Sequence, residues 1–139
     1  MLHLIKLSVG SESPETLEEF QAERLAQHGF LFHKTRMFPK RRDEILDSGG
    51  SIYWVIKGQI RCRQKLLDIE RVEADDGTPM TLFRLEQELV RTRPLPFRPF
   101  QGWRYFKPEN APEDMGSYKG EEASMPDAMK AELEKLGLL

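Results

Sequence analysis

The chain has little of what marks a protein for export, for a membrane or for metal binding. Cys62 is its single cysteine, so an intrachain disulfide is impossible and the fold must depend on packing. No apolar run approaches the length of a membrane span, and the opening MLHLIKL lacks the regions of a signal peptide. We therefore expect a cytoplasmic protein with no membrane partner.

Recognisable catalytic and cofactor-binding motifs are also missing. No two of the three histidines are three or four residues apart, and no Cys-x-x-Cys pair exists, so no metal-ligand spacing is present. The sequence also lacks a Gly-rich phosphate loop. We predict no cofactor, no metal site and no catalytic residue. The pattern favours a binding protein over an enzyme without deciding between them.

The charge of the chain is unevenly distributed. The formal net charge is −2, but residues 24–107 carry 17 Lys and Arg against 10 Asp and Glu, a balance of +7. Residues 1–23 sum to −4 and residues 108–139 to −5. A basic middle between two acidic ends favours an anionic partner for the central surface.

Residues 52–66 alternate between apolar and polar side chains. The even positions are apolar except for Gly58 and Gln64, and the odd positions end in a run of basic side chains. Because successive side chains of a strand point to opposite faces, this pattern predicts a long strand or a bent strand pair with one buried face. Cys62 falls on the apolar face, so we expect a buried, inert thiol there.

Other segments carry start and stop signals. Ser13 and Pro14 suit the cap and first position of a helix at residues 14–28, which Gly29 would end. After Leu66 the alternation shifts by one residue, which predicts a bulge, and Asp75-Asp76-Gly77 predicts a hairpin turn. The remaining expected elements are strands at 1–9, 30–37, 80–85 and 100–106, a short helix at 42–47, an extended connector at 94–99, an irregular acidic loop at 108–124 and a terminal helix at 125–137.

The order of these elements predicts a single α+β domain over residues 1–139. Helices and strands alternate only before residue 50, and hairpins follow, so the sheet should be mixed or mostly antiparallel. A bent sheet of this kind, flanked by two main helices, can roll into a partial β-barrel.

The candidate site is the polar face of residues 52–66. Basic side chains at spacing two repel one another unless an anion or an acidic neighbour faces them. We predict anion or nucleic-acid contacts for the following set: Lys57, Arg61, Arg63 and Lys65 on phosphates, with Tyr53, Tyr105 and Arg104 lining a base or nucleotide pocket. The alternative, in which acidic neighbours neutralise the cations, stays open.

Several stretches together resemble a family of bacterial proteins known as a domain of unknown function. They are MLHLIKL, GGSIYWVIKG, RQKLLDI, ELVRT, RPFQGWRYFKPENAP and ELEKLGLL, and the resemblance covers essentially the whole chain. The segment at 43–57, a helix followed by a Gly-led strand with the text YWVIK, is similar to PUA-like barrels such as the EVE and ASCH domains. That second resemblance implies a PUA-like fold and binding of RNA or a modified base.

These observations lead to three hypotheses on function. The first is a nucleic-acid-binding module, with RNA before DNA as its partner. The second is a small enzyme acting on a nucleotide or another anionic metabolite, which requires a closed pocket. The third is a protein-interaction module, in which the acidic residues 109–134 dock on another chain or fold back over the basic surface.

Overall fold

The computed structural model describes residues 1–115, and it confirms the α+β class. The predicted terminal helix at 125–137, and the part of the acidic loop after residue 115, lie outside the described residues. In chain order the elements are β1 (His3–Leu7), α1 (Pro14–His28), β2 (Leu31–Thr35), α2 (Arg42–Asp47), β3 (Ser51–Ile56), β4 (Gln59–Glu73), β5 (Pro79–Leu85), β6 (Val90–Pro96), β7 (Trp103–Phe106) and the short 3-10 helix η1 (Pro108–Asn110).

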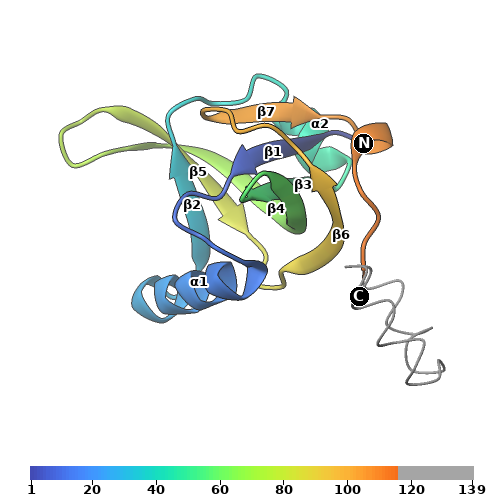
Figure 1. Cartoon of the computed structure of the whole chain (residues 1–139). Helices are drawn as coiled ribbons and strands as arrows, with labels where there is room; N and C mark the ends of the chain where they lie inside the picture. The colour runs from blue at the N-terminus through green and yellow to red at the C-terminus, as the bar shows by residue number, and fades with distance from the viewer. Residues whose placement is uncertain (116–139) are drawn as a thin grey trace, which may run out of the picture.

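In the described part of the chain, seven strands form one mixed sheet in the order β2-β5-β4-β3-β1-β7, with β6 pairing on β4. β1 and β3 run parallel, and the other pairs are antiparallel. Within residues 1–115, β2 and β7 end the strand order without pairing with each other, so the sheet is open. α1 lies across the lower end of the sheet and α2 lies at the upper right, behind β7 (Figure 1), and both helices contribute to the same core through Leu17 and Ile45.

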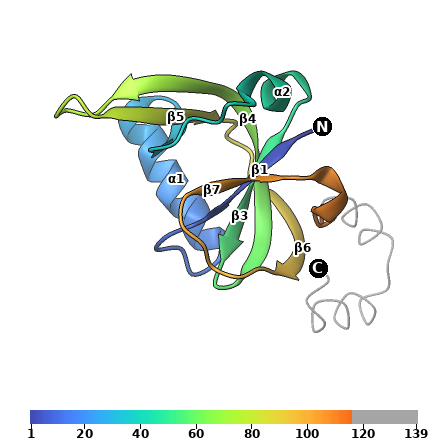
Figure 2. The same cartoon turned by 90° about the horizontal axis from the view of Figure 1, so that it is seen from above.

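The length and bend of β4 organise the sheet. Its first part pairs with β3 and β6, and its second part pairs with β5. The register shifts between Leu66 and Asp68, which confirms the predicted bulge and leaves Leu67 half exposed. Beyond the bulge, β4 and β5 extend as a hairpin away from the other strands (Figure 2). The hairpin turns at Gly77, as predicted.

The helix α1 has the predicted bounds and caps. The Ser13 hydroxyl accepts a hydrogen bond from the Thr16 N–H at 3.2 Å, and Pro14 occupies the first turn. Gly29 ends the helix with φ 79°, a left-handed conformation that costs glycine little. Buried Leu17 anchors the helix, and its next turn carries the half-exposed Phe20.

The alternating segment forms a strand pair, one of the two predicted alternatives, and its even positions other than the turn residue Gly58 are buried as predicted. The other face is not open in β3, where every residue is buried, so that part of the prediction was wrong. Lys57 (φ 50°) and Gly58 (φ 78°) make the two-residue turn between β3 and β4. A register shift follows at Trp54/Val55, opposite Ile60 and Cys62. One extra residue in β4 reverses the faces, so Ile60 lies on the side opposite to Cys62.

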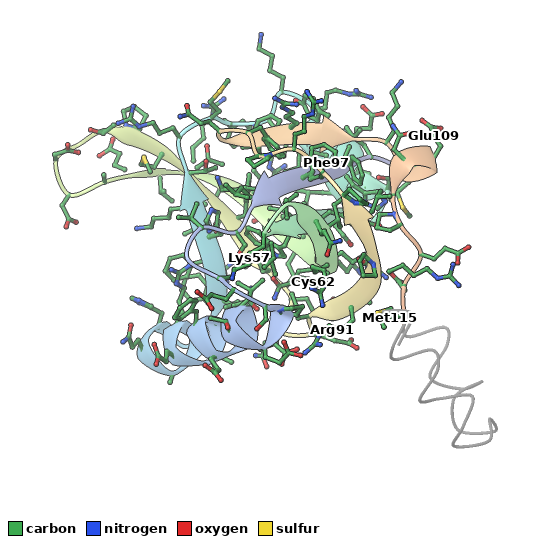
Figure 3. The ribbon with its side chains drawn as sticks, viewed as in Figure 1. Lys57, Cys62, Arg91, Phe97, Glu109 and Met115 are labelled. Atoms are coloured by element: carbon green, nitrogen blue, oxygen red, sulfur yellow. The ribbon has the colours of Figure 1, made fainter. Side chains whose placement is uncertain are left out.

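Both faces of β3 are buried because a core lies on each side of the sheet. The larger core contains Leu2, Leu4, Leu17, Leu31, Ile45, Ile52, Trp54, Ile56, Cys62, Leu66, Ile69, Phe83 and Leu85. The smaller core contains Ile5, Tyr53, Val55, Ile60 and Phe106, packed against Phe97 and Phe100. Cys62 lies inside the molecule, as predicted, and burial raises the pKa of its thiol to about 12 (Figure 3).

The prediction of an extended connector at residues 94–99 was only partly correct, because residues 94–96 belong to the strand β6. Leu95 pairs with Ile60, and on the other side of β6 the Arg93 N–H donates to the Glu113 carbonyl at 2.8 Å. Prolines fit here because β6 lies outside the main strand order, where few ladder donors are required.

Candidate functional site

The basic residues predicted to share one strand face do not form one continuous basic surface. They are Lys57, Arg61, Arg63 and Lys65. Lys57 lies in the hairpin turn, with its Nζ 3.9 Å from a Glu12 carboxylate oxygen. Arg61 is half-buried beside the register shift, and Lys65 is exposed. Neither Arg61 nor Lys65 forms an ion pair within residues 1–115.

Arg63 is neutralised by an acidic neighbour. Its Nε and Nη2 donate to the two carboxylate oxygens of Asp114 at 2.7 and 2.6 Å, and its Nη1 donates to the Ser51 hydroxyl at 3.0 Å. The hydrogen bonds to Asp114 raise the pKa of the Arg63 guanidinium. The alternative left open by the sequence therefore applies to this residue. Its partner comes from the segment after η1, not from the strands.

The two tyrosines also lie apart. Tyr53 was expected on an exposed face, but it is 4% exposed and packs edge-on against His3 and Phe106 at 5.0 and 5.2 Å between ring centroids. The cause is the second core, which covers the face that the alternation predicted to be open. Tyr105 is 36% exposed, and its hydroxyl accepts the Arg41 backbone N–H at 3.1 Å.

Arg104 and Tyr105 lie on opposite faces of β7. Arg104 pairs in register with Ile5, and its guanidinium lies 4.6 Å from the centre of the Phe100 ring. Tyr105 is the next residue along β7, so it points to the opposite face. The seven predicted residues do not line one pocket. Their role as an anion-binding set stays a prediction.

A pocket of about 290 Å³ opens elsewhere, between β1, the loop that follows it, α1 and β2. β1 ends at Leu7, and Gly10 (φ 84°) turns the chain toward α1, which leaves space beside the edge of β2. The lining residues are Lys6, Leu7, Ser8, Val9, Ser11, Leu17, Phe20, Gln21, Arg24, Phe32, His33, Lys34, Trp54 and Leu85. We call it the α1–β2 pocket.

The α1–β2 pocket is lined by cations and by no carboxylate. Lys6, Arg24 and Lys34 reach it from three different elements, and none forms an ion pair within the described part of the chain. Burial lowers the pKa of Lys6. Two other pockets near α1 and β5 contain Glu18 or Glu86 with Glu88, so this cationic lining is specific to the α1–β2 pocket among the three.

His33 is held neutral at this pocket. Burial, together with the nearby charges of Lys6 and Arg24, lowers the pKa of His33 to about 4. Its ring packs edge-on against Trp54 at 5.3 Å, and its Nε2 is buried without a hydrogen-bond partner among residues 1–115. A bound anion would offset the positive field of Lys6 and Arg24, which is one of the causes that keep His33 uncharged.

The inner end of the pocket is fixed by a pair of amides. Gln21 and Gln64 exchange two hydrogen bonds of 2.8 Å, and Gln64 also accepts from the Trp54 indole N–H at 3.2 Å. Gln64 donates to the Glu86 carbonyl at 2.8 Å, so every polar atom of this buried amide is bonded. Trp54 and α1 are thereby held in place at the pocket.

The pocket residues were not selected from the sequence, although one signal existed. Lys34 belongs to a cluster of cations at 34–42, and Arg24 follows the exposed Phe20 by one helical turn. Neither pattern shows that the loop after β1 leaves a hollow at the edge of β2. That hollow arises only when β1, α1 and β2 pack together.

Two negative findings concern residues 1–115. No helix there is both long and apolar enough to cross a membrane. In the same residues, no group of three or more histidine, cysteine, aspartate or glutamate side chains could hold a metal ion.

Comparisons with known proteins place the chain in a family. No curated protein matches it in sequence. Two crystal structures are similar to it, a serine-to-alanine mutant of the ASCH protein from Zymomonas mobilis and the ASCH protein itself, at 14% and 13% identity. Each match covers 77% of this chain and 89% of the Zymomonas mobilis chain, with a TM-score of 0.48. The family model DUF1489, described as a protein of unknown function, matches residues 4–139, so the chain belongs to the DUF1489 family.

Proposed function

We propose that the protein is a nucleic-acid-binding module, with RNA before DNA, and that the α1–β2 pocket receives one nucleotide. The observation that carries this proposal is the lining of the pocket. Lys6, Arg24 and Lys34 surround it without a carboxylate, next to the partly exposed rings of Phe32 and Phe20. Cations beside aromatic rings are what a phosphate and an unpaired base require together.

The size and form of the pocket agree with a small ligand. A volume of about 290 Å³ lies just below the range of about 300–1,000 Å³ found for ligand pockets. A single nucleotide fits this scale better than a duplex. The order of RNA before DNA rests on the sequence resemblance to PUA-like domains.

The exposed residues at the mouth of the pocket fit the same ligand. Val9 is 84% exposed on the loop after β1, and Phe20 is 47% exposed on α1. Apolar side chains at the rim of a cationic hollow can contact a base or sugar while Arg24 and Lys34 hold a phosphate.

A salt titration with matched variants tests the proposal. Binding of a fluorescent single-stranded RNA should weaken steeply with salt, with a log–log slope of about 0.7 for each phosphate contact. Lys34→Gln should weaken binding and reduce this slope by roughly that amount, since the side chain is exposed at the pocket and its loss should leave the fold intact.

The matched control is Lys107→Gln, which removes an exposed lysine beyond β7 and outside the pocket. Its affinity and slope should stay close to those of the unmodified chain. The proposal fails if the chain has no affinity for single-stranded RNA or DNA at low salt. It also fails if the two variants lose affinity equally.

Three other predicted cations could contact phosphates of the RNA outside the pocket. Arg61, Lys65 and Arg104 make no ion pair within residues 1–115, so they are candidates for phosphates that run beyond the pocket. They lie on elements that do not line the pocket, and their loss should weaken RNA binding uniformly across sequences.

A second candidate function, an enzyme acting on a nucleotide or another anionic metabolite, is favoured by one observation. The pocket holds His33 and Lys6 together, and burial lowers the pKa of each, a perturbation that is frequent at catalytic sites. This candidate requires a chemical change in a bound mononucleotide, detectable by chromatography, that His33→Gln abolishes while binding persists.

A further inference from the structure

The outer face of β2 and β5 presents two phenylalanine rings beneath cations. Phe30 and Phe32 lie 5.0 Å apart between ring centroids, at a tilt of 35°. The Arg84 guanidinium lies 4.5 Å from the centre of the Phe30 ring. Arg24 and Lys34 lie 5.5 and 5.8 Å from the centre of the Phe32 ring. We call this surface the β2 platform.

The strand register explains why these residues are available. Phe32 and Arg84 are partners across β2 and β5, so their side chains share one face of the sheet. Their sequence neighbours Leu31 and Phe83 belong to the larger core on the opposite face. α1 reaches the platform only at Phe32, where the His28 ring packs edge-on at 5.1 Å, and both phenylalanines remain partly exposed.

The platform is continuous with the α1–β2 pocket. Phe32, Arg24 and Lys34 belong to both, because the pocket opens at the edge of β2 and the platform begins on its outer face. β2 lies at the outer side of the sheet with α1 below it, so a chain leaving the pocket can follow this face (Figure 1).

The two ends of the platform differ in charge. Arg84 is held by Glu70 at 3.6 Å, and Arg24 and Lys34 have no carboxylate partner within the described residues. A hollow of about 490 Å³ adjoins Phe30 and Arg84, and Glu86 and Glu88 also line it. Phosphates would therefore stay near Arg24 and Lys34, while an uncharged base can enter the end at Phe30.

We propose that the β2 platform is a second nucleotide subsite, so that the ligand is an unpaired strand whose next base stacks on Phe30 and Arg84. This inference rests on the proposed function and adds the substrate class, a single strand of at least two nucleotides. Aromatic rings and arginine planes both stack on bases without strong sequence preference. A duplex cannot present a free base face to the platform.

The test compares ligands of different length on the full chain. Fluorescence anisotropy would measure a single-stranded RNA of about eight nucleotides, the same RNA as a duplex, and each ribonucleoside monophosphate. The single strand should bind most tightly. Phe30→Leu should weaken single-strand binding roughly fivefold or more and leave monophosphate binding within about twofold, since the pocket is unchanged.

Matched variants separate stacking from stability. Phe38→Leu removes another ring that lies under an arginine, with Arg71 at 3.9 Å, away from the platform, and it should leave RNA binding unchanged. Arg84→Gln, at a partly exposed side chain, repeats the test where Phe30→Leu perturbs folding. Arg84→Gln should weaken the binding of single-stranded RNA and leave the binding of the monophosphates unchanged.

The possible failures are distinguishable. If the unmodified chain binds the monophosphate and the single strand equally well, or if both platform variants keep full single-strand affinity, the platform is overturned and the pocket proposal stands. If the unmodified chain binds neither ligand, the proposed function itself fails, and the platform with it.

Discussion

Two histidines, the buried His3 and the half-buried His33, are uncharged for the same physical reason, which is burial beside cations. His3 accepts the Ser51 backbone N–H at its Nδ1, at 2.9 Å, and burial beside Arg63 lowers its pKa to about 4. His33 lies at the α1–β2 pocket, where burial and two cations lower its pKa to about 4 as well. Each is therefore a neutral side chain that the folded state keeps from being protonated.

The first prediction concerns the pH dependence of stability. An unfolded histidine has a pKa near 6.5, so between about pH 6.5 and 4 the unfolded chain binds more protons than the folded chain. The free energy of unfolding should therefore fall as the pH drops through this window, by roughly 1–3 kcal/mol for each of His3 and His33. Urea unfolding at several pH values measures it.

A matched pair of variants assigns this effect. His33→Leu removes one of the two buried titrating groups together with an unpartnered nitrogen, so it should flatten about half of the decline. His28→Leu changes an exposed histidine at the end of α1 and should keep the full decline. An unaltered decline in His33→Leu would contradict the neutral, buried state of His33.

Single residues show the limit of reading side-chain position from alternation. Cys62 and Leu66 were placed correctly in the core, because apolar side chains at spacing two face inward. Tyr53 was placed wrongly, since the same rule treats the opposite phase as exposed. The rule cannot anticipate a second core, and Tyr53 lies in one with Phe106.

At the scale of elements, local signals located most of the boundaries. Ser13, Pro14 and Gly29 gave the bounds of α1, and the bulge after Leu66 and the turn at Gly77 were also predicted. These features depend on the backbone preferences of a few neighbouring residues. The β3–β4 turn was left open between a long strand and a bent pair, and β6 was missed because prolines mask its pairing with β4.

The junction of α2 and β3 depends on one close approach. A Cβ at Gly50 would overlap the Leu2 carbonyl oxygen and crowd Ile45. The Gly50 backbone also bonds on both sides, donating to the Ile45 carbonyl at 2.9 Å and accepting from the Leu66 N–H at 3.1 Å. The N-terminal end of β1, the end of α2 and the centre of β4 therefore meet at this glycine.

The second prediction tests that junction. Gly50→Ala should lower the free energy of unfolding by about 2–4 kcal/mol, because Leu2 must move and β1 pairs with β3 just beyond it. Gly49→Ala is the control: Gly49 has φ 73° and open space around it, so it should cost only about 1–2 kcal/mol. Equal losses in urea denaturation would show that the close approach at Gly50 is absent.

At the scale of the whole molecule, the sheet separates two basic regions. Lys6 lies on the face of Leu4 and Trp54, where the α1–β2 pocket opens. Arg63 lies on the face of Tyr53, which the smaller core covers. The charge segregation in the sequence favoured an anionic partner for the central residues, but it could not indicate which cations the chain itself would neutralise.

Asp114 neutralises one of these cations, Arg63. It sits beside β6, bridges to Thr92 and grips Arg63 with two short hydrogen bonds. Both side chains of the pair are about one-quarter to one-third exposed, so the pair is partly shielded from water. The acidic end of the chain thus begins by neutralising the face that the sequence had favoured for phosphate binding.

The last prediction uses this pair to decide between the two faces. Asp114→Asn leaves Arg63 without its counter-ion, and it should lower the free energy of unfolding by about 1–3 kcal/mol, between exposed and buried ion pairs. Glu113→Gln, which removes the same charge from the exposed neighbour facing Arg93, should cost less. Because Arg63 and the α1–β2 pocket lie on opposite faces of the sheet, both variants should raise the affinity for single-stranded RNA slightly and equally. A gain confined to Asp114→Asn would instead make Arg63 the phosphate contact and move the binding face away from the pocket.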